Sequence, residues 1–254
     1  MMVERSENLI LSMKWGTLYP ADYVNRLFKA TCDNSQRPVH FVCFTDNSVG
    51  LDPNIDARPI PDIGVPQEKH FSGAWPKMTL FGRHYKDLSG RALFIDLDTM
   101  ILDDIDPFYD VPGGIVMINS GDNWKQHATH HTPLPASGVF TMDVESQVDM
   151  YDRFVADQPQ AYADFILEQE FIAAYAHDIQ FWDTRWVLSF KAHLRQPLIK
   201  DWFVEPKAPP EGAKMVAFHG NPRPIELLKN NWGTFPHHGK GPVSWFQEYW
   251  ERYS

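Results

Sequence analysis

The sequence has few cysteines, no long apolar run and no excess of basic residues, and each absence excludes a class of protein. Cys32 and Cys43 are its only cysteines, too few for a disulfide framework and not spaced as zinc ligands. No stretch reaches the roughly 18 consecutive apolar residues of a membrane span. Acidic residues outnumber basic ones by 33 to 23, which gives a formal net charge of −10 and argues against a general nucleic-acid binder.

Targeting signals and glycine-rich nucleotide loops are also missing. The segment Met1–Glu7 is polar and precedes no apolar signal core, so we expect a cytoplasmic protein, with peripheral contact at the inner face of a membrane left open. Neither a GxGxxG pattern nor a Walker loop occurs, so dinucleotide binding of the Rossmann kind and P-loop phosphate binding are unsupported. The 254 residues are 43% hydrophobic and 14% aromatic, which is typical of one large globular domain.

Strand and helix patterns alternate in the first half and favour an α/β fold with a parallel, doubly wound sheet. Strands are expected at 9–13, 39–44, 57–60, 91–97, 114–118, 138–142 and 215–218. Helices are expected at 21–30, from Pro76, at 144–156, at 162–176 and in the aromatic C-terminal segment, which has the spacing of a docking helix. Pro206, Pro209 and Pro210 indicate a surface loop. We therefore expect one α/β domain over 1–254, with a mixed C-terminal extension.

The most distinctive feature is Phe94–Asp98, in which a buried strand ends in two carboxylates separated by one residue. Open α/β sheets bind ligands at the carboxyl ends of their strands. In an extended chain Asp96 and Asp98 point to the same side, where both can bind one hard cation such as Mn²⁺ or Mg²⁺. The alternative is an acidic turn that caps the next element, because a bare D-x-D pattern also arises by chance.

Further segments extend this pattern in order along the chain. They are Lys77, Leu102–Ile105, Ala136–Phe140, Glu168–Glu170 and Phe218–Pro224. Together with the acidic pair, the set resembles GT-A-fold glycosyltransferases, specifically the type of glycogenin and the bacterial lipopolysaccharide galactosyltransferases. The resemblance spans most of the chain, from Leu9 to about Glu226, and rests on the ordered set, since no single element is specific.

The resemblance implies a fold, an activity and a metal site. The fold is a mixed central sheet flanked by helices, with a nucleotide-binding half at about 8–110 and an acceptor and catalytic half at about 111–254. The activity is metal-dependent transfer of a sugar from a nucleotide-diphosphate donor, a UDP-sugar, to a glycan or lipid-linked acceptor. The metal is Mn²⁺ or Mg²⁺, and Asp96, Asp98 and His219 are its implied ligands.

The same pattern assigns residues to the donor. Lys77 and Arg223 supply positive charge to the diphosphate, whose negative charge grows as it leaves. The backbone at Ser137 and Gly138 approaches the donor sugar. Gly220, with prolines on either side of Arg223, makes a rigid loop that can come close to the donor.

Candidates for catalysis and for base binding follow from position in the pattern. The residues implied beside the reacting carbon are Glu168, Gln169 and Glu170. Tyr19, Thr17 and Asp46 come after the first two strands, where this fold holds a uracil ring. Tyr19 is a candidate for stacking on the base and Asp46 for accepting a hydrogen bond from it; the alternative for each is a turn residue or core aromatic.

Some positions depart from the family pattern. Ala136 stands where the family has Asn, so a side-chain contact to the donor sugar is missing. Arg223 replaces a Lys, and Arg can also bind a phosphate in a bidentate manner. Retention of configuration through Gln169 or Glu170 and inversion through a carboxylate base both stay open.

Two other functions were weighed. A non-catalytic binder of nucleotide sugars or carbohydrates fits the same fold, and Ala136 favours it slightly. A haloacid-dehalogenase-type phosphatase also begins with a strand ending in two aspartates, but Met100 occupies the position where that family has Thr. His127, His130 and His131 lie in a loop over the acceptor region; they lack Cys partners for zinc and are left open as acceptor or metal contacts.

Overall fold

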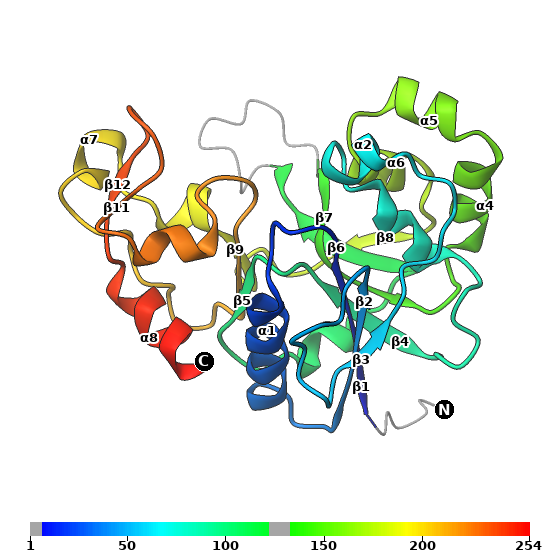
Figure 1. The fold of residues 1–254 in the computed structure, drawn as a ribbon, viewed down its shortest axis with the longest axis horizontal. Coiled ribbons are helices and arrows are strands. Elements are labelled where there is room, and N and C mark those ends of the chain that lie inside the picture. The colour runs from blue at the N-terminus through cyan, green and yellow to red at the C-terminus, as the bar shows by residue number, and fades with distance from the viewer. Residues whose placement is uncertain (1–6, 122–132) are drawn as a thin grey trace.

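The computed structural model describes residues 7–121 and 133–254, and its centre is a seven-stranded mixed sheet (Figure 1). The strand order is β3-β2-β1-β4-β7-β6-β8. These strands are β1 (Asn8–Lys14), β2 (Val39–Thr45), β3 (Asp56–Arg58), β4 (Arg91–Ile95), β6 (Ile115–Asn119), β7 (Pro135–Asp143) and β8 (Ile179–Phe181). The fold class is therefore α/β with a mixed central sheet, as predicted.

The half of the sheet formed by the first four strands is parallel. β1 pairs with both β2 and β4, and β2 pairs with β3, all in parallel register. All seven residues of β1 are buried, the pattern of a strand covered on both faces. Helix α1 (Ala21–Asp33) covers one face with its buried side chains Tyr23, Val24 and Leu27. This arrangement brings the carboxyl ends of β1 and β4 to the same edge of the sheet.

The other half departs from the parallel pattern. β7 runs antiparallel to both of its neighbours, β4 and β6, and β6 pairs with β8 in parallel. The expectation of a parallel, doubly wound sheet thus holds only for β3-β2-β1-β4. The antiparallel direction matters for the site, because residues 136–139 of β7 pass directly beside the end of β4.

Helices α4 (Val148–Ala156), α5 (Gln158–Asp164) and α6 (Glu168–Tyr175) gather at one end of the sheet with α2 (Gln67–Phe71) and the 3₁₀ helix η1 (Trp75–Phe81) (Figure 1). Two boundaries differ from the predictions. The helix expected at 144–156 begins at Val148, because Glu145 has a left-handed φ of 66°. The single helix expected at 162–176 is two helices, because the backbone is extended at Phe165 and Leu167.

A second, three-stranded sheet has the order β5-β10-β9. Its strands are β5 (Thr99–Ile101), β9 (Val187–Ser189) and β10 (Met215–Ala217). The remaining elements are the 3₁₀ helices η2 (Asp106–Tyr109) and η4 (Pro224–Leu228), the π-helical turn η3 (Phe190–Leu194), α7 (Leu198–Asp201), β11 (Asn231–Trp232), β12 (Gly239–Lys240) and α8 (Ser244–Arg252).

The aromatic C-terminal segment forms α8, and it packs against α1, which confirms the predicted docking helix. The rings of Tyr23 and Trp250 lie 5.1 Å apart, and the Arg26 guanidinium lies 4.2 Å from the Trp250 ring centre. Across the described ranges, the helices are too short or too polar to cross a membrane.

Candidate functional site

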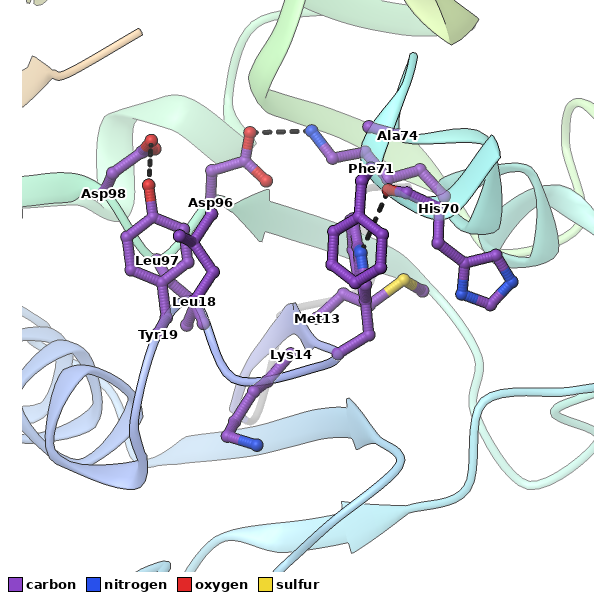
Figure 2. A pocket seen from close by; sticks show the side chains of 12 residues that line it. Met13, Lys14, Leu18, Tyr19, His70, Phe71, Ala74, Asp96, Leu97 and Asp98 are labelled. Carbon is purple, nitrogen blue, oxygen red and sulfur yellow. Dashed lines mark hydrogen bonds and ion pairs between the residues drawn. The ribbon is translucent and has the colours of Figure 1, made fainter. Parts of the chain in front are cut away.

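The acidic pair lies in a cavity at the carboxyl ends of β1 and β4 (Figure 2). The cavity measures about 180 Å³, and its wall includes Lys14 and Tyr19 from the β1 end, Lys77 from η1, and both carboxylates. In Figure 2 the side chains of Asp96 and Asp98 point to the same side of the chain. Both aspartates follow β4, which ends at Ile95 and not at Leu97 as expected, and they lie in a turn instead of an extended strand.

Backbone hydrogen bonds fix the turn that holds the pair. The Asp96 N–H donates to the Gly138 carbonyl at 2.8 Å, and the Thr99 N–H donates to the Asp96 carbonyl at 3.1 Å. The Phe218 N–H donates to the Asp98 carbonyl at 2.9 Å. Two segments far apart in the sequence, at Gly138 and Phe218, thus hold the turn at residues 96–98 together with its own local hydrogen bond, and they fix where the two side chains lie.

A buried lysine joins Asp96 to a second carboxylate. Lys77 Nζ lies 2.6 Å from Asp96 Oδ2 and 3.5 Å from Glu168 Oε1. The Ser137 hydroxyl donates to Glu168 Oε1 at 2.5 Å. Burial raises the pKa of both carboxyls, and the Lys77 charge opposes this. Burial lowers the pKa of Lys77, but Asp96 and Glu168 more than offset this and raise it to about 12, so Lys77 is a cation at neutral pH.

No basic side chain in the described part of the chain lies at hydrogen-bond distance from Asp98. Its Oδ2 accepts a hydrogen bond of 2.9 Å from the Tyr19 hydroxyl, and Tyr19 also packs on the ring of Tyr23 at 5.0 Å. Burial and the Asp96 charge raise the pKa of Asp98. Burial and Asp98 likewise raise the pKa of Tyr19, which keeps the phenol protonated as a donor. The structure therefore gives Tyr19 the role of orienting Asp98, which the sequence did not predict.

The three candidates at 168–170 face different surroundings. The Glu168 carboxylate is buried and reaches Lys77 and Ser137. The Glu170 carboxylate turns back to its own helix start, where it accepts from the backbone N–H groups of Ile166 at 2.8 Å and Leu167 at 3.0 Å. Gln169 is half-buried between them. The structure brings Glu168 into the acidic cluster and gives Glu170 a helix-capping contact.

A second cavity adjoins the first on the β2 side. It measures about 300 Å³, and Trp15 and His70 belong to the walls of both cavities. Asp46 lines it and accepts a hydrogen bond of 2.7 Å from the Gly16 N–H, so this carboxylate shapes the loop after β1. Thr17 is exposed on that loop and is absent from the walls of both cavities.

His219 lies near the acidic pair but is held by another residue. Its Nε2 lies 2.7 Å from the Ser189 hydroxyl, and desolvation together with the charge of Lys191 lowers its pKa to about 4, so its imidazole is neutral at pH 7. Within 7–121 and 133–254, no group of three or more His, Cys, Asp or Glu side chains is close enough to hold a metal ion. The structure thus brings together two of the three implied ligands.

The loop after β10 borders the site from the second sheet. Gly220 has a left-handed φ of 75°, and a Cβ there would lie 3.3 Å from Lys191 Nζ. Arg223 is half-buried at the start of η4; burial raises the pKa of both Tyr19 and Tyr23, and the nearby Arg223 charge opposes this rise. Arg223 therefore lies on the same side of the molecule as the acidic pair.

The structure adds two neighbours that sequence reasoning missed, Ser189 and Lys191. Ser189 ends the short strand β9 and Lys191 lies two residues further on. The three residues of β9 are too few to show a strand period in the sequence. The available signal was a lysine directly after an apolar run, which is too common to single out. His127, His130 and His131 lie outside the described residues.

The chain matches no protein-family model and no curated protein, but it resembles several solved glycosyltransferase structures. The galactosyltransferase LgtC, in complex with donor and acceptor sugar analogs, aligns with a TM-score of 0.60 and 12% identity over 96% of this chain and 95% of that chain. The bifunctional glycosyltransferase WbbM aligns with a TM-score of 0.59 and 14% identity over 98% of this chain and 50% of that chain. The glycosyltransferase GlyE of Streptococcus pneumoniae aligns with a TM-score of 0.58 and 8% identity over 97% of this chain and 62% of that chain.

These likenesses establish the fold. The chain has the α/β fold of GT-A glycosyltransferases such as LgtC, which confirms the resemblance found in the sequence. Because the identities are 8% to 14%, the agreement lies in the course of the backbone, and any activity has to be argued from the site.

Proposed function

We propose that the protein transfers a sugar from a nucleoside-diphosphate donor, a UDP-sugar, to a glycan or lipid-linked acceptor, with Mn²⁺ or Mg²⁺ as the cofactor. The observation that supports this most is the acidic cluster: Asp96 and Asp98 lie at the carboxyl ends of β1 and β4 with Lys77 and Glu168 beside them. The likeness to a galactosyltransferase solved with donor and acceptor sugar analogs supports the same class of reaction.

The donor set fits a hard divalent cation. Asp96 and Asp98 offer carboxylate oxygens on the same side of the chain, and Mg²⁺ sites in nucleotide enzymes commonly use one or two carboxylates and complete the shell with substrate phosphates. Burial disfavours the charged form of both groups, so a bound cation would stabilise them. Asp96 and Asp98 would hold the cation, and His219, neutral at pH 7, stays a candidate third ligand.

The two adjoining cavities suit a ligand with two parts. The cavity on the β2 side, lined by Trp15, Ile60 and Val65, offers an apolar surface for the nucleobase, while Asp46 can accept a hydrogen bond from it. The cavity that contains the acidic pair suits the diphosphate and its cation. Because Trp15 and His70 line both cavities, the two cavities are close enough for one ligand to occupy both.

In the proposed reaction, the bond between the anomeric carbon and the diphosphate oxygen breaks, and its electron pair leaves with the diphosphate. The acceptor hydroxyl forms the new bond to carbon, and its proton passes to the departing diphosphate oxygen. A bound cation would supply Lewis-acid stabilisation of the leaving group. Lys77 orients Asp96 and favours its charged form, Tyr19 orients Asp98, and the Ser137 hydroxyl fixes the Glu168 carboxylate beside Lys77.

Calorimetric titration of UDP tests the proposal. We expect UDP to bind in the presence of Mn²⁺, and we expect excess chelator to weaken that binding. Asp98→Asn should reduce the Mn²⁺-dependent affinity by at least about tenfold, equivalent to 1.4 kcal/mol. Asp152→Asn is the matched control, because Asp152 is an exposed carboxylate whose only ion pair in the described ranges is the surface one with Arg83, and it should bind like the wild type.

Two outcomes would count against the proposal. Absence of UDP binding both with Mn²⁺ and with chelator would exclude UDP as the nucleotide of the donor. Metal-independent binding that Asp98→Asn leaves unchanged would exclude the acidic pair as the cation site. If UDP binds as expected, hydrolysis of a panel of UDP-sugars then identifies the sugar.

A further inference from the structure

The second sheet brings a lysine to the acidic pair from a part of the chain that no motif marks. β10 pairs antiparallel with β5 and parallel with β9, so that Ala217 lies opposite both Thr99 and Ser189. Three chain segments therefore meet at one edge of this sheet: Asp98 before β5, His219 after β10, and the turn η3 after β9. Lys191 is the second residue of that turn.

Contacts at this edge direct the Lys191 ammonium toward the site. Its Nζ would lie 3.3 Å from a Cβ at position 220, so the glycine leaves room for it beside the His219 loop. The Lys191 charge lowers the pKa of His219. Burial and Arg195 lower the pKa of Lys191, whereas the Asp98 carboxylate raises it. The lysine is thus within electrostatic reach of both His219 and Asp98.

The ammonium of Lys191 has no anionic partner among the described residues. Although the side chain is half-buried, it makes neither a hydrogen bond nor an ion pair with the residues at 7–121 and 133–254. Lys77 and Lys214, by contrast, are paired with Asp96 and Asp103. A lysine that is partly withdrawn from water and left without an anion is suited to receive one from a ligand.

We infer that Lys191 binds the diphosphate of the nucleotide donor from the edge of the second sheet, where η3 lies beside the His219 loop and the Asp98 turn. The inference rests on the proposed function, because the ligand is the diphosphate of that donor. Lys191 acts as a fixed positive charge that stabilises the developing charge of the leaving diphosphate, and it forms no covalent bond. Asp96 and Asp98 repel the diphosphate, since like charges repel, so the diphosphate needs positive charge from the bound divalent cation and from nearby basic side chains.

Binding measurements with parts of the ligand test this role. In the presence of Mn²⁺, Lys191→Gln should weaken binding of both UDP and inorganic pyrophosphate by roughly ten- to a hundredfold, the range for a hydrogen bond to a charged group. Uridine, which has no phosphate, should bind the variant and the wild type equally. Lys191→Arg should restore much of the affinity, because its guanidinium retains the charge.

Lys207→Gln is the matched control. Lys207 is exposed, and the substitution changes the net charge equally without touching the site, so its UDP and pyrophosphate affinities should equal those of the wild type. The thermal unfolding midpoint of Lys191→Gln should match the wild type, because no fold contact of the ammonium is lost.

The outcomes separate the inference from the proposed function. If wild-type protein binds UDP with Mn²⁺ and Lys191→Gln binds it equally well, the role of Lys191 is wrong and the proposed function stands. If Lys191→Gln weakens uridine as much as UDP, the lysine supports the fold of the site and the inference is also wrong. If wild-type protein binds neither UDP nor pyrophosphate, both the role of Lys191 and the proposed function are wrong.

Discussion

Lys77 is the buried charge on which the acidic cluster depends. Its ammonium contacts Asp96 at 2.6 Å and lies 3.5 Å from Glu168, and 6% of its side chain is exposed. Removing one partner of a buried ion pair commonly destabilises a protein by about 3–5 kcal/mol, because the other charge is left uncompensated. Here a single substitution would leave two carboxylates without their cation.

We therefore expect Lys77→Met to lower the free energy of unfolding by about 3–5 kcal/mol at neutral pH. The loss should be smaller at pH 5 than at pH 7: burial raises the pKa of Asp96 and Glu168, the Lys77 charge opposes this rise, and its contribution disappears as these carboxyls become protonated. In the wild type, the contribution is also lost at the alkaline end, as the pH rises through the Lys77 pKa of about 12. Urea denaturation at both pH values measures the effect.

The control for this prediction is Lys207→Met, since Lys207 is exposed. It should change the unfolding free energy by no more than about 0.5 kcal/mol at either pH. An equal loss for Lys77→Met at both pH values would show that packing of its alkyl chain, and not its charge, holds the site together.

At the scale of single elements, the start of α6 decides which of two neighbouring glutamates meets the site. The backbone is extended at Leu167, and the Glu168 N–H donates to the Gly73 carbonyl at 3.0 Å. This contact turns Glu168 inward, while Glu170, two residues on, satisfies the free N–H groups at the helix start. The two glutamates therefore have separable roles.

Glu170→Ala should lower the unfolding free energy by about 1 kcal/mol, the usual effect of losing a helix cap. Its Mn²⁺-dependent UDP affinity should stay that of the wild type, because the carboxylate does not reach the acidic cluster. Chemical denaturation and calorimetry measure the two quantities. Glu248→Ala, at an exposed position of α8, controls for the loss of one negative charge. Weaker UDP binding by Glu170→Ala would contradict this prediction and show that Glu170 contributes to the binding site.

Most of the elements that the sequence predicted have enough residues to show a period, although the three-residue strands β3 and β10 were also expected. The strands around Leu11, Phe41 and Phe94 and the helix at 21–30 all appear close to their expected positions. β5, β8 and β9 have three residues each, too few for alternation to be recognised. The sequence also did not predict the break between α5 and α6. Apolar residues continue at helical spacing through 165–167, although tertiary contacts keep the backbone there extended.

On the scale of the whole molecule, one hydrophobic core joins both sheets and the C-terminal helix. Phe246 of α8 is fully buried, and its ring centre lies 6.0 Å from that of Phe218 and 5.5 Å from that of Trp250. Because Phe218 directly follows β10 and Trp250 packs on α1, this single ring connects the second sheet to the helix that covers the main sheet.

Phe246→Ala should lower the unfolding free energy by about 3–5 kcal/mol, the range for deleting a buried phenylalanine side chain. Phe235→Ala is the matched control: Phe235 is 77% exposed, and its loss should change stability by no more than about 0.5 kcal/mol. Circular dichroism and tryptophan fluorescence should report one coincident transition for Phe246→Ala. Two separate transitions would mean that the C-terminal part unfolds independently of the main sheet.

Part of the candidate site could be predicted from the sequence because those residues lie in recognisable motifs. Lys77, Asp96, Ser137, Gly138 and Glu168 were all predicted, and the structure brings them together. What the sequence could not provide was the partner of each group. The hydrogen bond from Tyr19 to Asp98, that between His219 and Ser189, and the position of Lys191 depend on strand pairing between distant segments.

The pairing of β10 with β5 and β9 also governs when the site can exist during synthesis. The chain leaves the ribosome from its N-terminus, so β1 to β4 and the acidic pair emerge early. The turn at residues 96–98 obtains its hydrogen bond to Phe218, and the edge beside Asp98 obtains Lys191 and His219, only after more than half of the remaining chain has followed. Until then a nascent chain has its two carboxylates but lacks the segments that hold the turn at 96–98 from the second sheet, so the candidate site is complete only after β9 and β10 have joined β5.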